Sequence, residues 1–159
     1  MTAAGDLLAR IGGGLFQQAF VVDDLDAARA ALSATLGCGP FVTLPPSDLD
    51  YELRGETVRC ALEIGFARSG NMQIELIRPV RGAGLHVEFL ATNGPGAHHL
   101  GFLVADIAAE VAATRFPRVM GGQFGSLQFC YLDTWDALGC YVELVEDPDA
   151  MMMSLMPWR

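Results

Sequence analysis

The sequence predicts an α+β fold built from two tandem β-α-β-β-β modules related by a pseudo-twofold axis. The main observation is an internal repeat, in which residues 17–25 resemble residues 99–107. Each copy reads as a strand, then an Asp, then an Ala-rich helix. A second pair follows in the same order, because residues 74–77 (IELI) resemble residues 142–145 (VELV). The repeated segments carry polar residues at matching places, which indicates a site built on the internal symmetry.

The first module is expected over residues 15–78. After its first strand, Asp23 or Asp24 caps a helix that Gly37 ends. The proline-rich segment 45–48 (PPSD) is expected to be a loop. The expected strands cover about 15–22, a short segment starting at 39–41, and a hairpin of 58–67 with 72–78.

The second module is expected over residues 98–146, after a hinge over residues 79–97. The glycine-rich segment 121–125 reads as a turn that precedes a hairpin. The remaining expected elements are a hinge helix over 86–92, a strand over 98–104, a helix over 106–115, and hairpin strands over 126–133 and 140–146. The chain of 159 residues thus reads as one domain with a tail over 147–159.

Composition excludes several classes of protein. Apolar residues make up 52% of the chain, which is enough for one core, and no run approaches the ~20 residues of a membrane span. Net charge is −9 and the pI about 4.6, which argues against binding to nucleic acid or to an anionic membrane. An anionic substrate held by a few local arginines stays possible.

The four cysteines and the chain's start indicate a cytoplasmic protein. No two cysteines have C-x-x-C spacing, so they are expected to be buried free thiols in a reducing compartment. No basic and apolar leader of the signal-peptide type opens the sequence. The Met-rich tail is expected to pack on the protein or on a second subunit, and exposed sheet edges together with this tail predict a homodimer.

Five motifs occur in a fixed order along the chain: the two strand-Asp-helix segments and residues 36–41 (LGCGPF), 96–101 (GAHHLG) and 139–144 (GCYVEL). Together they resemble the vicinal-oxygen-chelate superfamily, which includes glyoxalase I, methylmalonyl-CoA epimerase, extradiol dioxygenases and bleomycin-resistance proteins. The resemblance covers about residues 15–146 and is closest to the glyoxalase and epimerase branch. It implies that each module contributes a curled mixed sheet, and that the two sheets line one cleft for a small-molecule substrate.

The resemblance also implies a divalent metal in that cleft, held by one residue from the first strand and one from the last strand of each module. The matching positions are Gln17 and Glu75 in the first module, and His99 and Glu143 in the second. Each interrupts an apolar strand, where an unpaired polar group is costly. One imidazole, two carboxylates and an amide oxygen suit Mn²⁺, Co²⁺, Ni²⁺ or Mg²⁺ better than Zn²⁺.

A site of this type implies a metal-dependent isomerase or lyase. The metal stabilises an enediolate, and a carboxylate moves a proton next to a carbonyl. Glu143 is the expected base. Glu63, which interrupts the apolar residues 60–66, is a second candidate, with a solvent-facing role as its alternative. Arg59 and Arg78 are expected to be solvated rather than to hold a substrate carboxylate.

Two other functions stay open. A non-catalytic binding protein of the bleomycin-resistance type would use the same cleft without needing all four ligands. An extradiol dioxygenase ranks lower, because it needs two histidines and one carboxylate on iron, and only His99 maps to a ligand position. His98 is expected to face the helices as a structural residue, and His86 to lie on the surface.

Overall fold

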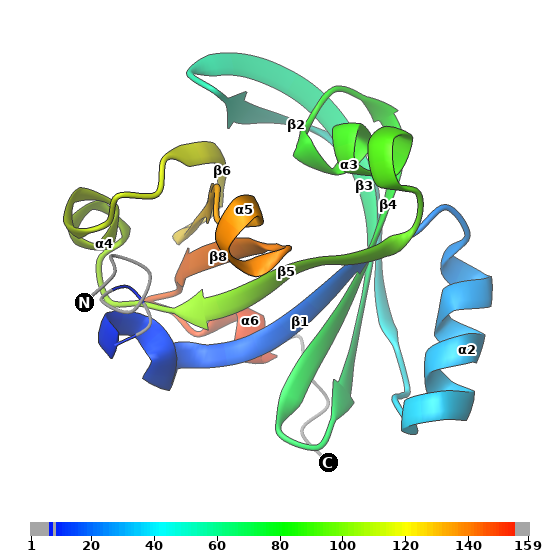
Figure 1. The fold of residues 1–159 in the computed structure, drawn as a ribbon. Helices are drawn as coiled ribbons and strands as arrows, with labels where there is room; N and C mark the ends of the chain where they lie inside the picture. Colours follow the sequence, from blue (N-terminus) through cyan, green and yellow to red (C-terminus); the bar gives the residue numbers. More distant parts are fainter. Residues whose placement is uncertain (1–6, 8, 155–159) are drawn as a thin grey trace.

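The core of the protein is one mixed sheet of eight strands, seen in a computed structural model that describes residues 7 and 9–154 (Figure 1). The strands are β1 (Leu15–Val21), β2 (Val42–Leu53), β3 (Glu56–Ser69), β4 (Met72–Gly82), β5 (Gly96–Leu103), β6 (Arg118–Phe124), β7 (Leu127–Leu132) and β8 (Tyr141–Glu146). The helices are η1 (Gly12–Gly14), α2 (Leu25–Leu36), α3 (Leu85–Asn93), α4 (Ile107–Ala113), α5 (Trp135–Leu138) and α6 (Met151–Ser154). The sheet closes into a barrel in the order β1-β4-β3-β2-β6-β7-β8-β5.

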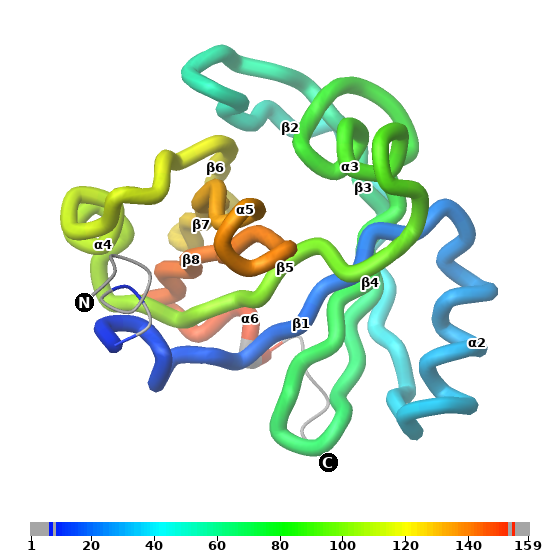
Figure 2. The backbone as a smooth tube through the Cα atoms, in the orientation of Figure 1, coloured from blue at the N-terminus to red at the C-terminus, as the bar shows by residue number. Residues whose placement is uncertain are grey.

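The same topology occurs twice around the barrel. β1 pairs in parallel with β4, and the sheet continues through β3 to β2. β5 pairs in parallel with β8, and the sheet continues through β7 to β6. The two sets join within one chain through the antiparallel pairs β1–β5 and β2–β6, and Figure 2 shows β1 and β5 running side by side. The predicted fold class, with two β-α-β-β-β units, is confirmed.

The repeated aspartates cap the two matching helices. The carboxylate of Asp24 accepts a hydrogen bond from the backbone N–H of Ala27, and that of Asp106 accepts one from Ala109, both at 3.0 Å. Gly37 then ends α2 in the left-handed region with a φ of 65°. These caps satisfy free helix N–H groups, which explains why each copy of the repeat turns from strand to helix at the same place.

Alternation along β4 and β8 decides which side chains face the inside of the barrel. Leu76 packs with Leu25 beneath α2, so the neighbouring Glu75 faces inward. Leu144 packs in the cluster beneath α4, so Glu143 faces inward as well. Figure 1 shows α2 and α4 at opposite sides of the molecule, each covering the outer face of its own half. The two helices therefore cover the outside of the sheet, and the inside of the barrel is available for a cleft.

The segment expected to be a loop lies within a strand, and the turn expected over residues 121–125 is limited to Gly125, which forms it with Ser126. β2 runs through Pro45 and Pro46, and its register with β3 shifts there, because prolines cannot donate to the sheet and a bulge accommodates them. β6 includes Gly122, where a Cβ would lie 2.8 Å from the rings of Phe129 and Tyr51. That glycine makes room for aromatic rings rather than for a turn.

The last two strands pair as expected but are not joined by a simple turn. β7 and β8 are antiparallel neighbours, and α5 lies between them in the chain, so they do not form the expected simple hairpin. The described cysteines are all free, and three of them are buried. No helix in the described ranges is long and apolar enough to cross a membrane. Residues 155–159 of the tail lie outside the described residues.

Closure of the sheet bears on the predicted homodimer. The closing pair β2–β6 involves only Glu52 with Gly121 and Leu53 with Met120, so most of β2 is an exposed edge within the described residues. The homodimer stays a prediction, and both of its sequence arguments, an exposed sheet edge and the Met-rich tail, still stand.

Candidate metal centre

Four polar side chains from the two halves of the repeat meet inside the barrel. They are Gln17 of β1, Glu75 of β4, His99 of β5 and Glu143 of β8, and all four are buried. Nε2 of His99 lies 2.9 Å from Oε1 of Gln17, 3.3 Å from Oε2 of Glu75 and 3.1 Å from Oε2 of Glu143. These four side chains are far apart in the chain, and they occupy matching positions of the repeat. The structure brings them together.

These distances fit a shared divalent ion. Neighbouring ligands of a six-coordinate ion with bonds of ~2.1 Å lie about 3 Å apart. Oε2 of Glu143 is buried and lies 3.1 Å from Nε2 of His99, but it receives no well-aligned hydrogen bond, because the Nε2–H of His99 is directed at Gln17. A buried carboxylate oxygen without such a bond is costly, and a cation would remove that cost. The donor set and its spacing thus suit an ion that prefers oxygen ligands.

A second glutamine sets the direction of the first. Nε2 of Gln17 donates to Oε1 of the buried Gln73 at 2.6 Å, which turns the Gln17 oxygen toward His99. Gln73 was not predicted, although it lies two residues before Glu75 and so shares its strand face. Opposite these residues, a Cβ on Gly101 would lie 2.8 Å from Oε1 of Gln17. The absence of a side chain at Gly101 therefore makes room for the side chain of Gln17.

His98 contacts the site more closely than strand alternation suggests. The register of β1 with β5 skips it, so it is the extra residue of a β-bulge. Its ring packs on Phe89 of α3, with centroids 5.0 Å apart, as expected for a residue that faces the helices. Yet its Nδ1 lies 2.9 Å from Nδ1 of His99. Burial lowers the pKa of His98 well below its usual value, so neutral His98 accepts a hydrogen bond from the Nδ1–H of His99.

His86 is buried, so the prediction of a surface position was wrong. It lies on α3, which covers the end of the barrel near the cluster, and its Nε2 lies 3.0 Å from the hydroxyl of Tyr131. Burial lowers its pKa to about 3, so the ring is neutral. Tyr131 was also missed by the sequence analysis. Burial and the nearby Glu143 raise its pKa well above the usual value, so the hydroxyl keeps its proton.

Charge in the cluster is balanced by a proton on His99. Burial alone lowers the pKa of His99, but the carboxylates of Glu143 and Glu75 outweigh it and raise the pKa to about 9. Burial raises the pKa of Glu75, and His99 offsets part of that shift while the charge of Glu143 adds to it. At neutral pH a protonated His99 therefore takes the place that a cation would have between the two carboxylates.

A cleft of about 430 Å³ opens beside the two carboxylates. Leu62 and Ile64 of β3 line it, so the intervening Glu63 faces the other side of the sheet and pairs with Arg78 at 2.8 Å. The interpretation of Glu63 as a second base was therefore wrong. Arg59 likewise pairs with a surface acid, Asp50, at 2.8 Å rather than facing a ligand.

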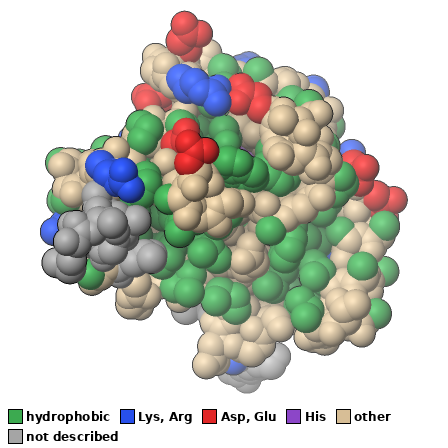
Figure 3. All heavy atoms as spheres, viewed as in Figure 1, with side chains coloured by type: hydrophobic (Ala, Val, Ile, Leu, Met, Phe, Trp, Pro, Cys, Tyr) green, Lys and Arg blue, Asp and Glu red, His purple; other side chains and the backbone are tan. Residues whose placement is uncertain are grey.

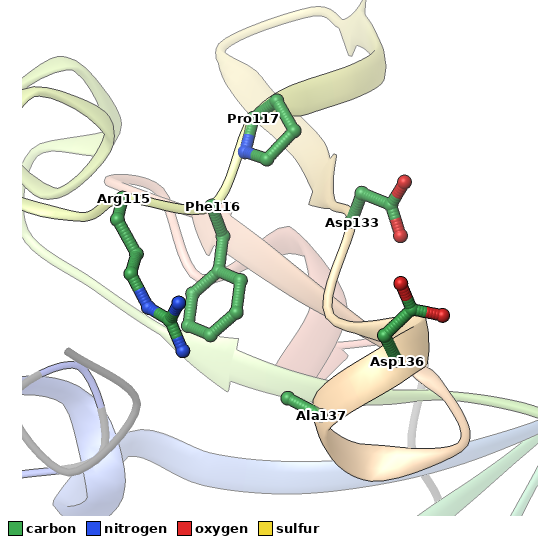
Figure 4. Close-up of a pocket in the computed structure, with 6 residues that line it drawn as sticks. All are labelled: Arg115, Phe116, Pro117, Asp133, Asp136 and Ala137. Atoms are coloured by element: carbon green, nitrogen blue, oxygen red, sulfur yellow. The ribbon is translucent and has the colours of Figure 1, made fainter. Parts of the chain in front are cut away.

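A second hollow of about 430 Å³ lies elsewhere and shares no lining residue with the cleft. Figure 4 shows Arg115 and Phe116 on one side of it, with Asp133 and Asp136 on the other. The guanidinium of Arg115 stacks over the ring of Phe116, 4.9 Å from its centroid. This hollow contains no histidine and has no part in the cluster around His99.

Comparison with solved structures supports the fold. The chain is 23% identical to methylmalonyl-CoA epimerase from Mycobacterium tuberculosis, with 86% of this chain and 89% of that chain covered and a TM-score of 0.58. It is 21% identical to a hypothetical protein from Bacillus halodurans, with coverages of 83% and 92% and a TM-score of 0.61. It is 26% identical to a methylmalonyl-CoA epimerase in complex with methylmalonyl-CoA and NH4+, with coverages of 85% and 94% and a TM-score of 0.57.

Sequence comparison assigns the family. No curated protein matches the chain significantly. The model of the glyoxalase/bleomycin resistance protein/dioxygenase superfamily matches residues 16–117, which include the strand that carries His99 and all but the first residue of the first module. That match covers more than half of the chain and agrees with the doubled topology of the barrel. The chain therefore belongs to the glyoxalase/bleomycin resistance protein/dioxygenase superfamily.

Proposed function

We propose that the protein is a divalent-metal-dependent isomerase or lyase that moves a proton on a carbon next to a carbonyl group. The observation that carries this proposal is the convergence of three side-chain oxygens within 3.3 Å of Nε2 of His99, at the inner end of a cleft. Superfamily membership supports it, as does the similarity to an epimerase whose structure contains methylmalonyl-CoA.

In this proposal Gln17, Glu75, His99 and Glu143 hold the ion. When bound, the ion supplies a Lewis acid that stabilises negative charge on a substrate oxygen. The oxygen-rich set favours Mn²⁺, Co²⁺, Ni²⁺ or Mg²⁺ over Zn²⁺. His98 accepts the Nδ1–H of His99, which leaves Nε2 of His99 free to bind a metal.

Glu143 is the proposed base. Both Glu75 and Glu143 line the cleft, so both can reach a substrate there. Oε2 of Glu143 receives no well-aligned hydrogen bond and is the oxygen best placed to take up a proton. The apolar walls exclude water from the reacting carbon, and exclusion of water strengthens each electrostatic contact in the site.

A second candidate is a binding protein without catalytic activity. It is favoured by one observation, namely that protonated His99 already balances Glu75 and Glu143 without a metal. An extradiol dioxygenase receives no such support. Nδ1 of His98 faces His99, and His86 faces Tyr131, so within the described ranges only His99 directs a ring nitrogen at the carboxylates.

Metal content and thermal unfolding test the proposal. We expect protein purified without chelator to contain a divalent ion, and EDTA to lower Tm. An ion present at about 100 times its Kd stabilises the folded state by about 2.7 kcal/mol. For a chain of this size that corresponds to a Tm shift of roughly 5–10 °C. Mn²⁺, Co²⁺ or Ni²⁺ should restore the Tm.

Variants make the assignment specific. His99→Ala or Glu143→Ala should abolish the recovery of Tm by metal, because each removes a ligand. Glu63→Gln is the matched control, since it changes a carboxylate outside the cleft and should leave the metal response intact. Protein without bound metal whose Tm does not respond to any of these ions would reject the metalloenzyme and favour the binding protein.

A further inference from the structure

We infer that the cleft takes an uncharged and largely apolar small molecule, and that it excludes phosphorylated substrates such as coenzyme A thioesters. This inference rests on the proposed function only for the end of the ligand that meets the carboxylates. The rest of the argument concerns the walls that would hold the body of the ligand.

Polar groups of the cleft are confined to one end and to the rim. Glu75, Glu143 and Tyr131 lie at the inner end together with the neutral ring of His86, which contacts the Tyr131 hydroxyl. The exposed Ser47 lies at the rim. The other walls are mostly aliphatic and aromatic, and they come from β2, β3, β4, β6, β7 and α6. A cleft of this size and character binds ligands mainly by burying apolar surface, with a few polar groups setting orientation.

One wall of the cleft is a packed aromatic surface. The rings of Phe124 and Phe129 stack with centroids 5.7 Å apart and planes 13° apart. Tyr51 meets both rings edge-on, at 6.2 and 6.1 Å. The missing side chain at Gly122 allows this close approach. Such a wall offers flat apolar area, which suits a ring or an extended alkyl body better than a strongly hydrated group.

No arginine or lysine side chain lines the cleft among the described residues, so none is there to pair with an anionic ligand body. Its lining among the described residues includes two carboxylates and no arginine, and the chain contains no lysine. Seven arginines make ion pairs with carboxylates elsewhere: Arg10, Arg29, Arg54, Arg59, Arg78, Arg81 and Arg118. Arg68 donates a hydrogen bond to the backbone oxygen of Gly70, Arg115 stacks on Phe116 in the other hollow, and Arg159 lies outside the described residues. A phosphate entering the cleft would lose water and gain no partner.

The surface follows the same pattern. On the face shown in Figure 3, arginine side chains lie beside acidic ones toward one end, and hydrophobic side chains cover much of the middle. Coenzyme A carries several phosphate groups, so its binding calls for cations that are free to pair with them. Although the chain is similar to an epimerase with bound methylmalonyl-CoA, we therefore do not expect this cleft to bind that substrate.

Two fluorescent probes that differ by one charged group test the inference. N-phenyl-1-naphthylamine is neutral, and 1-anilinonaphthalene-8-sulfonate has the same rings with a sulfonate. Both increase in emission in an apolar site. We expect the neutral probe to bind the full chain at least tenfold more tightly than the sulfonate, without added metal. Propionyl-CoA at millimolar concentration should not displace the neutral probe.

A charge added at the rim of the cleft should change this preference. Ser47→Arg places a cation in the lining at an exposed position, where folding tolerates it. It should strengthen binding of the sulfonate probe severalfold and leave the neutral probe unchanged. Thr57→Arg is the matched control, because it adds the same charge at an exposed position of β3 outside the lining. It should change neither affinity.

The outcomes separate this inference from the proposed function. Equal or tighter binding of the sulfonate probe, displacement by propionyl-CoA, or failure of the neutral probe to bind would each overturn the inference. Metal content is measured on the same sample. Metal-containing protein that prefers the anion keeps the proposed function and rejects this inference. Metal-free protein that prefers the neutral probe keeps the inference and rejects the metalloenzyme.

Discussion

Metal binding should release a proton from His99, and this makes affinity depend steeply on pH. In the metal-free protein Glu143 and Glu75 raise the pKa of His99 to about 9, against burial. A metal ligand must be unprotonated, so at any pH below this pKa the ion displaces the proton from Nε2. Apparent affinity should rise about tenfold for each pH unit between pH 7 and 8 and level off above pH 9.

The magnitude follows from the distance between the pKa and the pH. At pH 7 the pKa of about 9 lies roughly two units higher, so releasing the proton costs about 3 kcal/mol of binding free energy. A histidine with an ordinary pKa near 6.5 would impose almost no cost at that pH. The slope of log Kd above pH 7 therefore reports whether His99 is held protonated by the two carboxylates.

Competition with a fluorescent chelator measures the slope, and calorimetry in buffers of different ionisation enthalpy counts the protons released. The His99→Gln variant should bind Mn²⁺ more weakly and lose the slope above pH 7, because its amide does not titrate. Affinity of the unmodified protein that stays constant from pH 7 to 8.5 would refute the reasoning. It would mean that His99 is neutral before the metal binds, or that it does not bind the metal.

Three other outcomes are expected. His98→Phe keeps the ring volume but removes the acceptor for His99, and should weaken Mn²⁺ binding about tenfold by the same titration, whereas His98→Asn should retain most of the affinity. Asp106→Ala removes the cap of α4 and should lower the unfolding free energy by about 1 kcal/mol in urea, with no change in metal affinity. Light scattering at micromolar concentration should show a homodimer, and a monomer there would contradict that prediction.

Local sequence patterns determined most of the architecture. The internal repeat predicted two equivalent modules, and the Asp of each copy marked the start of a helix because capping depends only on neighbouring residues. Alternation along β4 puts the neighbours of Glu75 against α2, so Glu75 itself faces inward. In the same way, the neighbours of Glu143 on β8 pack against α4, so Glu143 faces inward. Resemblance to a known superfamily then related Gln17, Glu75, His99 and Glu143 to one site.

The tertiary structure decided which face of each strand became the inside of the barrel, which the alternation of residues could not show. Apart from Glu63, residues 60–66 are apolar or glycine on both faces of β3, so the sequence could not show that Glu63 points away from the cleft. His98 contacts His99 because the register of two strands distant in sequence produces a bulge, and His86 is buried because α3 covers the barrel end. Period-two patterns determine which residues share a face, whereas which face becomes the inside depends on long-range pairing.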